Sequence, residues 1–235
     1  MTDLFPAAPV PRVPVQGGRT FPVRRIYCVG RNFADHAREM GATAPASKAE
    51  RGNPVFFLKP ADAIVTGDAD LPYPPGTRDL HHEVELVVAI GHDAPAGVLP
   101  RDAALALIVA YGVGLDLTRR DLQAAAKARG LPWDTGKAFD RSAPVSTLVP
   151  AAQVQGLDDL MLALQVNGEV RQQGSLRDLI WDVADILHEL SLLFELRAGD
   201  LVFMGTPAGV GPLVAGDEFV ASLGDIAVLR GRITP

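Results

Sequence analysis

The sequence predicts an α+β fold built on a mainly antiparallel sheet. Short strand patterns predominate along the chain, helical patterns are few, and the two do not alternate regularly, as a doubly wound fold would require. The chain has 235 residues, of which 48% are hydrophobic, so it can bury a sizeable core within one large domain. We therefore expect a proline-rich tail with an edge hairpin over residues 1–21 and a single domain over residues 22–235.

Charge and cysteine content exclude several classes of protein. The net charge of −6 and the lack of a Lys/Arg cluster argue against binding to nucleic acid, so a small molecule is the expected partner. A single cysteine, Cys28, rules out an internal disulfide framework and a Cys-rich zinc site, and we interpret it as a small buried residue. The N-terminus lacks a signal-peptide pattern, and no apolar run reaches the ~20 residues of a membrane helix. We expect a soluble, cytoplasmic protein without a membrane partner.

The N-terminal quarter contains a hairpin, a strand and a short helix. Five prolines fall in the first 22 residues, and Gly17-Gly18 separates two apolar segments, which favours an edge hairpin. Residues 25–29 form a strand pattern, and residues 32–40 are predicted to form a short helix that ends at Gly41. Residues 41–53 show no periodicity, so we predict a loop, and its position after the helix suggests a lid.

Strand patterns continue through the middle of the chain. Residues 55–58 are predicted to form a strand that Pro60 stops, and residues 71–77 a proline-rich loop. A strand is expected from Glu83 to Gly91. Residues 101–110 have the pattern of a helix.

A strand and a helix follow this segment. In residues 111–116 glycines alternate with apolar residues, which favours a strand ending at Asp116. Thr118 with Asp121 three residues later is typical of a helix N-terminus, so we predict a helix that Thr118 caps and that ends near Arg129.

The C-terminal third is predicted to hold a hairpin and the longest helix. Asn167-Gly168 lies between two strand patterns and suits the positive φ angles of a type I′ turn. Ser175 and Asp178 are predicted to open a helix with an apolar stripe at helical spacing, which we interpret as core. The stripe consists of Leu179, Val183, Ile186, Leu187, Leu190 and Leu193. From Leu201 onward the pattern is one of short strands and glycine-containing turns.

Two acidic residues adjoin a strongly apolar segment. Glu83 and Glu85 lie two residues apart, so on a strand both side chains share a face, beside the apolar residues 86–90. A buried carboxylate is costly unless it is protonated, paired or bound to a cation. We therefore predict a metal site at these two residues, with Asp116 as the third ligand. The alternative is a solvated strand edge.

The donor atoms of this predicted site select the ion. Three carboxylates without a nitrogen or sulfur ligand favour Mg²⁺, then Mn²⁺, then Ca²⁺. No organic cofactor is expected. The glycine-rich segment at residues 205–212 lacks the ending of a phosphate-binding P-loop. Its small residues would instead let backbone N–H groups and the Thr206 hydroxyl approach an anionic ligand.

Other candidate residues are histidines and a lysine. His81 and His82 are adjacent on a strand, so they face opposite sides and do not chelate a metal together; we expect one to line the pocket and the other to be structural. His36 and Glu39 lie three residues apart in the predicted short helix, close enough to share a face. They are either a general base and the carboxylate that orients it, or an ordinary surface contact. Lys137 either holds a substrate carboxylate or is exposed.

Six segments, in order, resemble the fumarylacetoacetate hydrolase family, in particular its small acylpyruvase and fumarylpyruvate hydrolase branch. One such segment would be weak support, but six collinear ones are specific. The likeness runs from about residue 22 to the C-terminus. The segments are Tyr27 to His36, Phe57 to Pro60, Leu80 to Glu85, Leu115 to Asp121, Gly136 to Asp140 and Gly205 to Gly211.

The resemblance implies a fold and an assembly. The family fold is a mixed β roll or sandwich with flanking helices, so residues 22–235 would form one catalytic domain, and homodimers are expected. Phe33 departs from the tyrosine that is more usual at this position, so no hydroxyl acts there.

The resemblance also assigns roles to residues. Glu83, Glu85 and Asp116 would bind Mg²⁺ or Mn²⁺. His36 and Glu39 would be the water-activating pair, on a helix that orders when substrate binds, with Lys137 as a further catalytic residue. The implied substrate-binding residues are Arg31, Lys59, Arg120, Gln123 and Thr206.

The function implied is hydrolysis of a carbon–carbon bond in an acylpyruvate. Fumarylpyruvate, giving fumarate and pyruvate in gentisate-type aromatic degradation, is the expected substrate because the segment Lys59 to Ala63 is similar to that of bacterial relatives. Two alternatives use the same site: decarboxylation of oxaloacetate, and isomerisation or tautomerisation of an oxo-dicarboxylate. A third is a carboxylate-binding protein without catalysis.

Overall fold

Two β-sheets packed face to face form the body of the computed structural model, which describes residues 3–39, 41, 45 and 50–235. Within these residues the larger sheet has eight strands. Their spatial order is β4 (Val55–Lys59), β3 (Arg25–Gly30), β15 (Asp200–Phe203), β8 (Val84–Ile90), β9 (Ile108–Leu115), β11 (Ala143–Val145) and β5 (Ile64–Thr66), and β12 (Val149–Pro150) pairs with β9 off this path.

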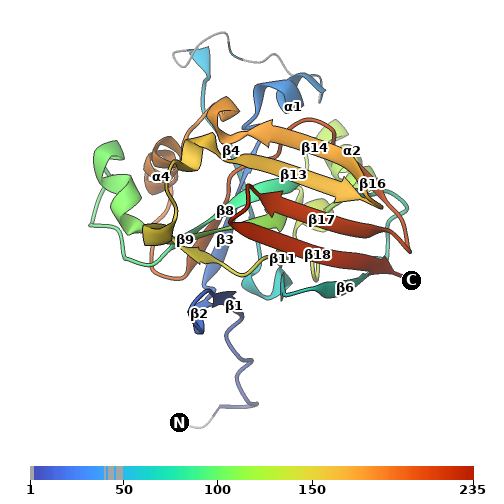
Figure 1. The fold of residues 1–235 in the computed structure, drawn as a ribbon, viewed down its shortest axis with the longest axis horizontal. Helices are drawn as coiled ribbons and strands as arrows, with labels where there is room; N and C mark the ends of the chain where they lie inside the picture. The colour runs from blue at the N-terminus through green and yellow to red at the C-terminus, as the bar shows by residue number, and fades with distance from the viewer. Residues whose placement is uncertain (1–2, 40, 42–44, 46–49) are drawn as a thin grey trace.

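The second sheet lies in front of the larger one in Figure 1. Its five strands are, in spatial order, β14 (Glu169–Ser175), β13 (Met161–Val166), β17 (Glu218–Leu223), β18 (Ala227–Thr234) and β6 (Ala69–Pro72). A three-stranded sheet joins β10 (Thr118–Arg119), β7 (Leu80–His82) and β16 (Gly211–Leu213), and β1 (Arg12–Val15) pairs with β2 (Arg19–Pro22).

Short helices lie around the sheets. The α-helices of the described residues are α1 (Ala34–Glu39), α2 (Arg120–Ala128), α3 (Asp134–Lys137) and α4 (Val183–Ser191). The 3₁₀ turns are Ala61–Ala63, Arg101–Leu107, Ala151–Gln153, Leu157–Asp159 and Leu176–Asp178. None of these helices is long and apolar enough to span a bilayer.

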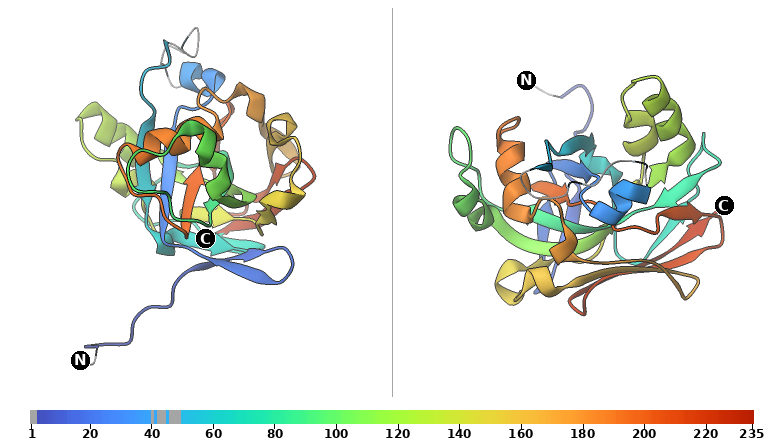
Figure 2. Two further views of the ribbon diagram at one scale, coloured as in Figure 1. Left: turned by 90° about the vertical axis from the view of Figure 1, so that its left-hand side faces the viewer. Right: turned by 90° about the horizontal axis from the view of Figure 1, so that it is seen from above.

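The predicted α+β class and the mixed sheet are confirmed. Most neighbouring strands run antiparallel, and the parallel pairs are β3 with β15, β5 with β11, and β6 with β18. The Asn167-Gly168 hairpin is present as β13 and β14, with φ angles of 52° and 81° at the two turn residues. The first hairpin, β1 and β2, is also present, and the chain before it extends away from the body (Figures 1 and 2).

The core lies on both faces of the larger sheet. All seven residues of β8 are buried, because strand alternation sends Leu86 and Val88 into the core between the two sheets and Val87 and Ala89 into a second core on the other face. The second core also contains Cys28, which is fully buried as predicted. A site on this second face is therefore surrounded by packed side chains rather than by water.

Three predicted boundaries in the middle of the chain were wrong. Residues 101–107 form a 3₁₀ turn and Ile108 already begins β9, because pairing with β8 overrides the helical pattern. Leu71, expected in a loop, lies in β6, where it pairs with Ile233 and is buried. Glu83 itself falls between β7 and β8, not within a strand.

Two predicted helix starts were also wrong. Thr118 pairs with His81 in β10 and its hydroxyl donates to the Asp116 carbonyl, so α2 begins at Arg120 without a side-chain cap. The later helix begins at Val183, because Asp182 forms a capping box, and Ser175 caps the 3₁₀ turn before it.

The predicted lid falls largely outside the described residues. Of residues 41–53, positions 42–44 and 46–49 are not described, and neither is residue 40 at the end of the predicted helix. Near the end of this segment Arg51 donates to Asp185 at 2.6 Å, which fixes the returning chain to the first turn of α4.

Replacing Leu190 with alanine should destabilise the protein by about 2–5 kcal/mol, because this side chain of α4 is fully buried. Leu193→Ala is the matched control: Leu193 is 65% exposed just beyond the helix, so the change should stay within about 0.5 kcal/mol. Urea denaturation followed by circular dichroism measures both. Equal losses for the two variants would contradict this packing.

Candidate active site

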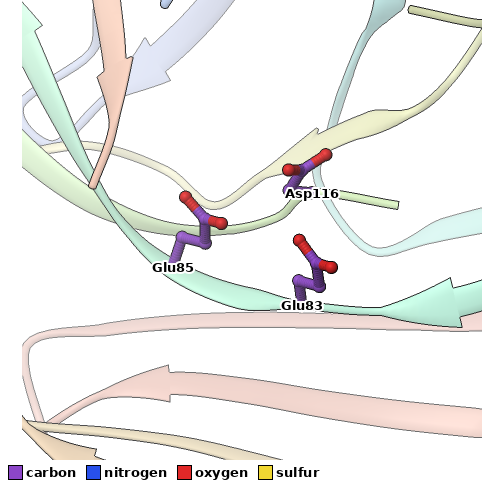
Figure 3. A group of neighbouring side chains, drawn as sticks. All are labelled: Glu83, Glu85 and Asp116. Carbon is purple, nitrogen blue, oxygen red and sulfur yellow. The ribbon is translucent and has the colours of Figure 1, made fainter. Parts of the chain in front are cut away.

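Three carboxylates come together where β8 and β9 pair. The register sets Glu85 opposite Gly114, and continuing it brings Glu83 opposite Asp116, whose N–H donates to the Glu83 carbonyl at 2.9 Å. Side chains two residues apart share a face, so all three carboxylates project to the same side. Figure 3 shows them directed toward one another, and one oxygen of each lies within 4.8 Å of the others. All three residues are buried.

Lysine and arginine side chains surround two of these carboxylates. The Lys137 ammonium donates to Glu83 Oε2 at 2.7 Å and to Asp116 Oδ2 at 2.6 Å. Arg120 donates to the other oxygen of Glu83. Burial raises the pKa of Glu83, but Lys137 and Arg120 outweigh this effect and hold that pKa well below its ordinary value. Burial lowers the pKa of Lys137, but Asp116 and Glu83 outweigh it and the pKa is raised. Both groups are therefore ionised at neutral pH.

The third carboxylate, Glu85, is buried among like charges. It accepts a hydrogen bond from the Gly205 N–H at 2.7 Å, and it makes no ion pair with a cationic side chain of the described residues. Burial, together with the negative charges of Asp116 and Glu83, raises its pKa well above the ordinary value. A carboxylate in this setting is stabilised by a proton or by a bound cation.

Asp116 has one oxygen that a cation could use. Lys59 Nζ lies 2.9 Å from Asp116 Oδ1, yet this buried oxygen accepts no well-aligned hydrogen bond from the described part of the chain. Asp116 thus has an oxygen available to bind a cation, and Glu85 has a raised pKa. A set of three carboxylates with these properties fits a hard divalent cation such as Mg²⁺ or Mn²⁺.

The backbone amide that meets Glu85 requires glycine at its position. Gly205 has a φ of +95°, in the region that side chains rarely adopt, and a Cβ there would lie 2.7 Å from the Asn32 Cβ. Asn32 itself is buried and joins two segments: its amide donates to the carbonyls of Trp181 and Met204. The loop after β15 is thus held close to the acidic residues.

His36 and Glu39 lie on α1 above this site. The His36 Nδ1 is 3.2 Å from Glu39 Oε2, and Glu39 Oε1 accepts a hydrogen bond from the Gly209 N–H at 3.1 Å. Burial lowers the pKa of His36, partly opposed by Glu83 and Glu39, so the ring is neutral at neutral pH. When Nδ1 donates its proton to Glu39, Nε2 is the nitrogen that can accept a proton.

These side chains enclose a cavity of about 30 Å³. Nine of the predicted site residues line it: Arg31, His36, Glu83, Glu85, Asp116, Arg120, Gln123, Lys137 and Thr206. Glu39 lies behind His36. Lys59 does not line the cavity: it is buried next to Asp116 and donates to the carbonyls of Leu117 and Lys137, contacts that fit positioning of Asp116 and not binding of substrate.

The two adjacent histidines are not among the lining residues. His81 lies between Asp79 and Arg120, with its Nδ1 accepting from the Arg120 Nε at 3.4 Å. His82 Nδ1 is 2.8 Å from Gln172 Oε1. Both are structural partners, so the expectation that one lines the pocket was wrong.

Gln172 is a positioning residue that the sequence did not reveal. It is 1% exposed, and besides its contact with His82 it donates to Thr206 Oγ1 at 2.7 Å and to the Pro207 carbonyl at 2.8 Å. It thus joins β14, the segment before β8 and the glycine-rich loop. No local pattern could have indicated these contacts, because the partners are 34 to 90 residues away.

Five further lining residues were also missed: Val29, Gly30, Phe57, Lys127 and Trp133. For one of them, the sequence spacing could have indicated a place in the site. Lys127 follows Arg120 by seven residues and Gln123 by four, so the three share one face of α2.

Comparison with known proteins identifies the family. Residues 25–234 match the family model described as fumarylacetoacetate (FAA) hydrolase C-terminal. The chain belongs to the fumarylacetoacetate hydrolase family. It is 42% identical over 203 residues to the oxaloacetate tautomerase of Escherichia coli, covering 86% of this chain and 89% of that one. It is 40% identical to the mitochondrial oxaloacetate tautomerase of Homo sapiens, covering 89% and 91%.

A solved structure agrees with this fold over nearly the whole chain. The fumarylpyruvate hydrolase of Pseudomonas aeruginosa, in complex with Mn²⁺ and pyruvate, is 45% identical, with a TM-score of 0.92 and coverage of 99% of both chains. The fumarylacetoacetate hydrolase-like fold expected from the motifs is therefore confirmed. These family members are enzymes, a hydrolase and tautomerases.

Replacing Glu85 with glutamine should weaken Mn²⁺ binding by at least about tenfold, because even changes behind metal ligands cost that much. Titration calorimetry with Mn²⁺ measures the affinity directly. Glu218→Gln, an exposed acidic residue on β17, is the control and should bind as the wild type does. Unchanged affinity in the Glu85 variant would remove that residue from the site.

Proposed function

We propose that this protein catalyses keto–enol tautomerisation of a 2-oxo dicarboxylate, with oxaloacetate as the first candidate substrate. The observation that carries the proposal is a neutral, buried His36, oriented by Glu39, in the same cavity as three clustered carboxylates. The two tautomerases at 40% and 42% identity support oxaloacetate.

The chain offers a base and a set of charged groups for this reaction. His36 Nε2 would take a proton from the carbon next to the keto group and return it in the reverse direction, as a tautomerase needs. Lys137 and Arg120 would bind the negatively charged oxygens of the substrate, and the Thr206 hydroxyl would orient them. A divalent cation held by the triad would supply further positive charge to the carboxylate and keto oxygens.

Hydrolysis of fumarylpyruvate is the second candidate. It uses the same electrostatic groups, with His36 taking a proton from water instead of from carbon. One comparison favours it: the fumarylpyruvate hydrolase of Pseudomonas aeruginosa is 45% identical to this chain, with a TM-score of 0.92.

Side-by-side assays separate the two reactions. The purified protein with Mg²⁺ is given enol-oxaloacetate, and ketonisation is followed by ultraviolet absorbance; fumarylpyruvate is given separately, and pyruvate is measured with lactate dehydrogenase. Faster ketonisation without pyruvate from fumarylpyruvate supports the first candidate, and the reverse result replaces it with the second. Pyruvate formed from oxaloacetate would indicate decarboxylation.

His36→Ala should lower kcat for the active substrate by about 10²- to 10⁴-fold, the usual contribution of a positioned base. Mn²⁺ affinity should stay unchanged, since the imidazole is not among the three clustered carboxylates. Steady-state kinetics and calorimetry test the two statements together. Full activity in the variant would show that another group is the base.

A further inference from the structure

Two cationic side chains of the cavity have no acidic partner. Arg31 and Lys127 both line it, and neither makes an ion pair with a carboxylate of the described residues. The other cations there, Arg120 and Lys137, are bound to Glu83. Positive charge left unpaired in a partly enclosed cavity favours a ligand that carries a further negative group.

The position of Lys127 separates it from the clustered carboxylates. It lies on the cavity face of α2, seven residues after Arg120, and a helix rises 1.5 Å per residue, so the two positions are about 10 Å apart along the axis. The Lys127 Nζ lies 5.0 Å from the centre of the Trp133 ring. Burial, with the nearby charges of Arg120 and Arg31, lowers the pKa of Lys127 to about 8. A bound carboxylate would relieve this repulsion.

Arg31 occupies an unusual backbone conformation at the same cavity. It directly follows β3 and has a φ of 60°, which residues other than glycine seldom adopt. Such conformations cluster at ligand-binding sites, where the surrounding structure holds them in place. Here the conformation fixes an exposed arginine at the cavity, close enough to Lys127 to act on its charge.

Two aromatic rings connect the two ends of the site. The Phe57 and Trp133 rings are in contact, with centroids 6.0 Å apart. The Lys137 ammonium lies 4.9 Å from the Phe57 centroid, while Lys127 lies over Trp133. An adjoining groove of about 330 Å³ shares Phe57, Trp133 and Lys137 with the cavity, so a carbon chain has room beside these rings.

We propose that Lys127 and Arg31 form a subsite for a second carboxylate, at the far end of a 2-oxo diacid longer than oxaloacetate. The 2-oxo end would lie at Glu83 and Lys137, and the apolar chain would pass along Phe57 and Trp133. This orientation rests on the proposed function. The subsite makes the site selective for diacids over monoacids of equal chain length, because only the diacid places a carboxylate beside the two cations.

A matched pair of ligands tests the subsite without turnover. 2-Oxopimelate and 2-oxoheptanoate have the same seven-carbon chain and differ only in the terminal carboxylate, and neither has the bond that a fumarylpyruvate hydrolase cleaves. Calorimetry in the presence of Mg²⁺ should show the diacid binding about tenfold more tightly to the wild type, the usual gain from one charge-assisted hydrogen bond.

Variants then assign the preference to Lys127. Lys127→Met should weaken the preference for the diacid, with Arg31 still in place, and leave monoacid affinity unchanged, and Lys127→Arg should retain the full preference. Arg129→Met removes an exposed charge two residues away, just beyond the end of the same helix, and should change neither affinity. Circular dichroism checks that each variant is folded.

The outcomes separate the subsite from the proposed function. Equal affinities of the wild type for the two acids, or a preference that is undiminished in Lys127→Met, would overturn the subsite. Failure to bind either acid would overturn the subsite, and the assay with enol-oxaloacetate decides the proposed function independently. Tight binding of both acids without preference would leave the proposed function standing and refute the subsite alone.

Discussion

The repulsion between three buried carboxylates is the constraint on which the rest of the site depends. Two unit charges about 4 Å apart repel each other by roughly 4 kcal/mol in typical protein surroundings, and burial adds a further cost. The register of β8 and β9 imposes this arrangement on Glu83, Glu85 and Asp116. Cationic side chains from three other segments offset this repulsion: Lys59 at the end of β4, Arg120 at the start of α2 and Lys137 at the end of α3.

The sequence was sufficient where local geometry decides the outcome. Alternation along a strand predicted a shared face for Glu83 and Glu85, and the Asn167-Gly168 turn predicted its hairpin. Asp116 was predicted as the third ligand from residue chemistry alone, and the strand register now explains why it lies beside Glu83. Prediction failed where tertiary contacts override local preference, as at Thr118, which entered a strand instead of capping a helix.

The missed residues share one physical cause. Gln172 joins three segments that are far apart in sequence. Lys127 becomes a lining residue of the cavity only because α2 directs it there. Lys59, predicted from its motif to contact substrate, lies next to Asp116, a metal-ligand candidate. The same electrostatic centre suits both proton transfer at carbon and hydrolysis.

Anomalous diffraction from crystals grown with Mn²⁺ and a 2-oxo acid tests most directly the claim that the triad is a cation site. We expect one strong manganese peak among Glu83, Glu85 and Asp116, with oxygen ligands from all three carboxylates, and with the Lys137 ammonium moved away from the position between Glu83 and Asp116. A peak elsewhere, or no peak with Lys137 still bridging these two carboxylates, would contradict the claim.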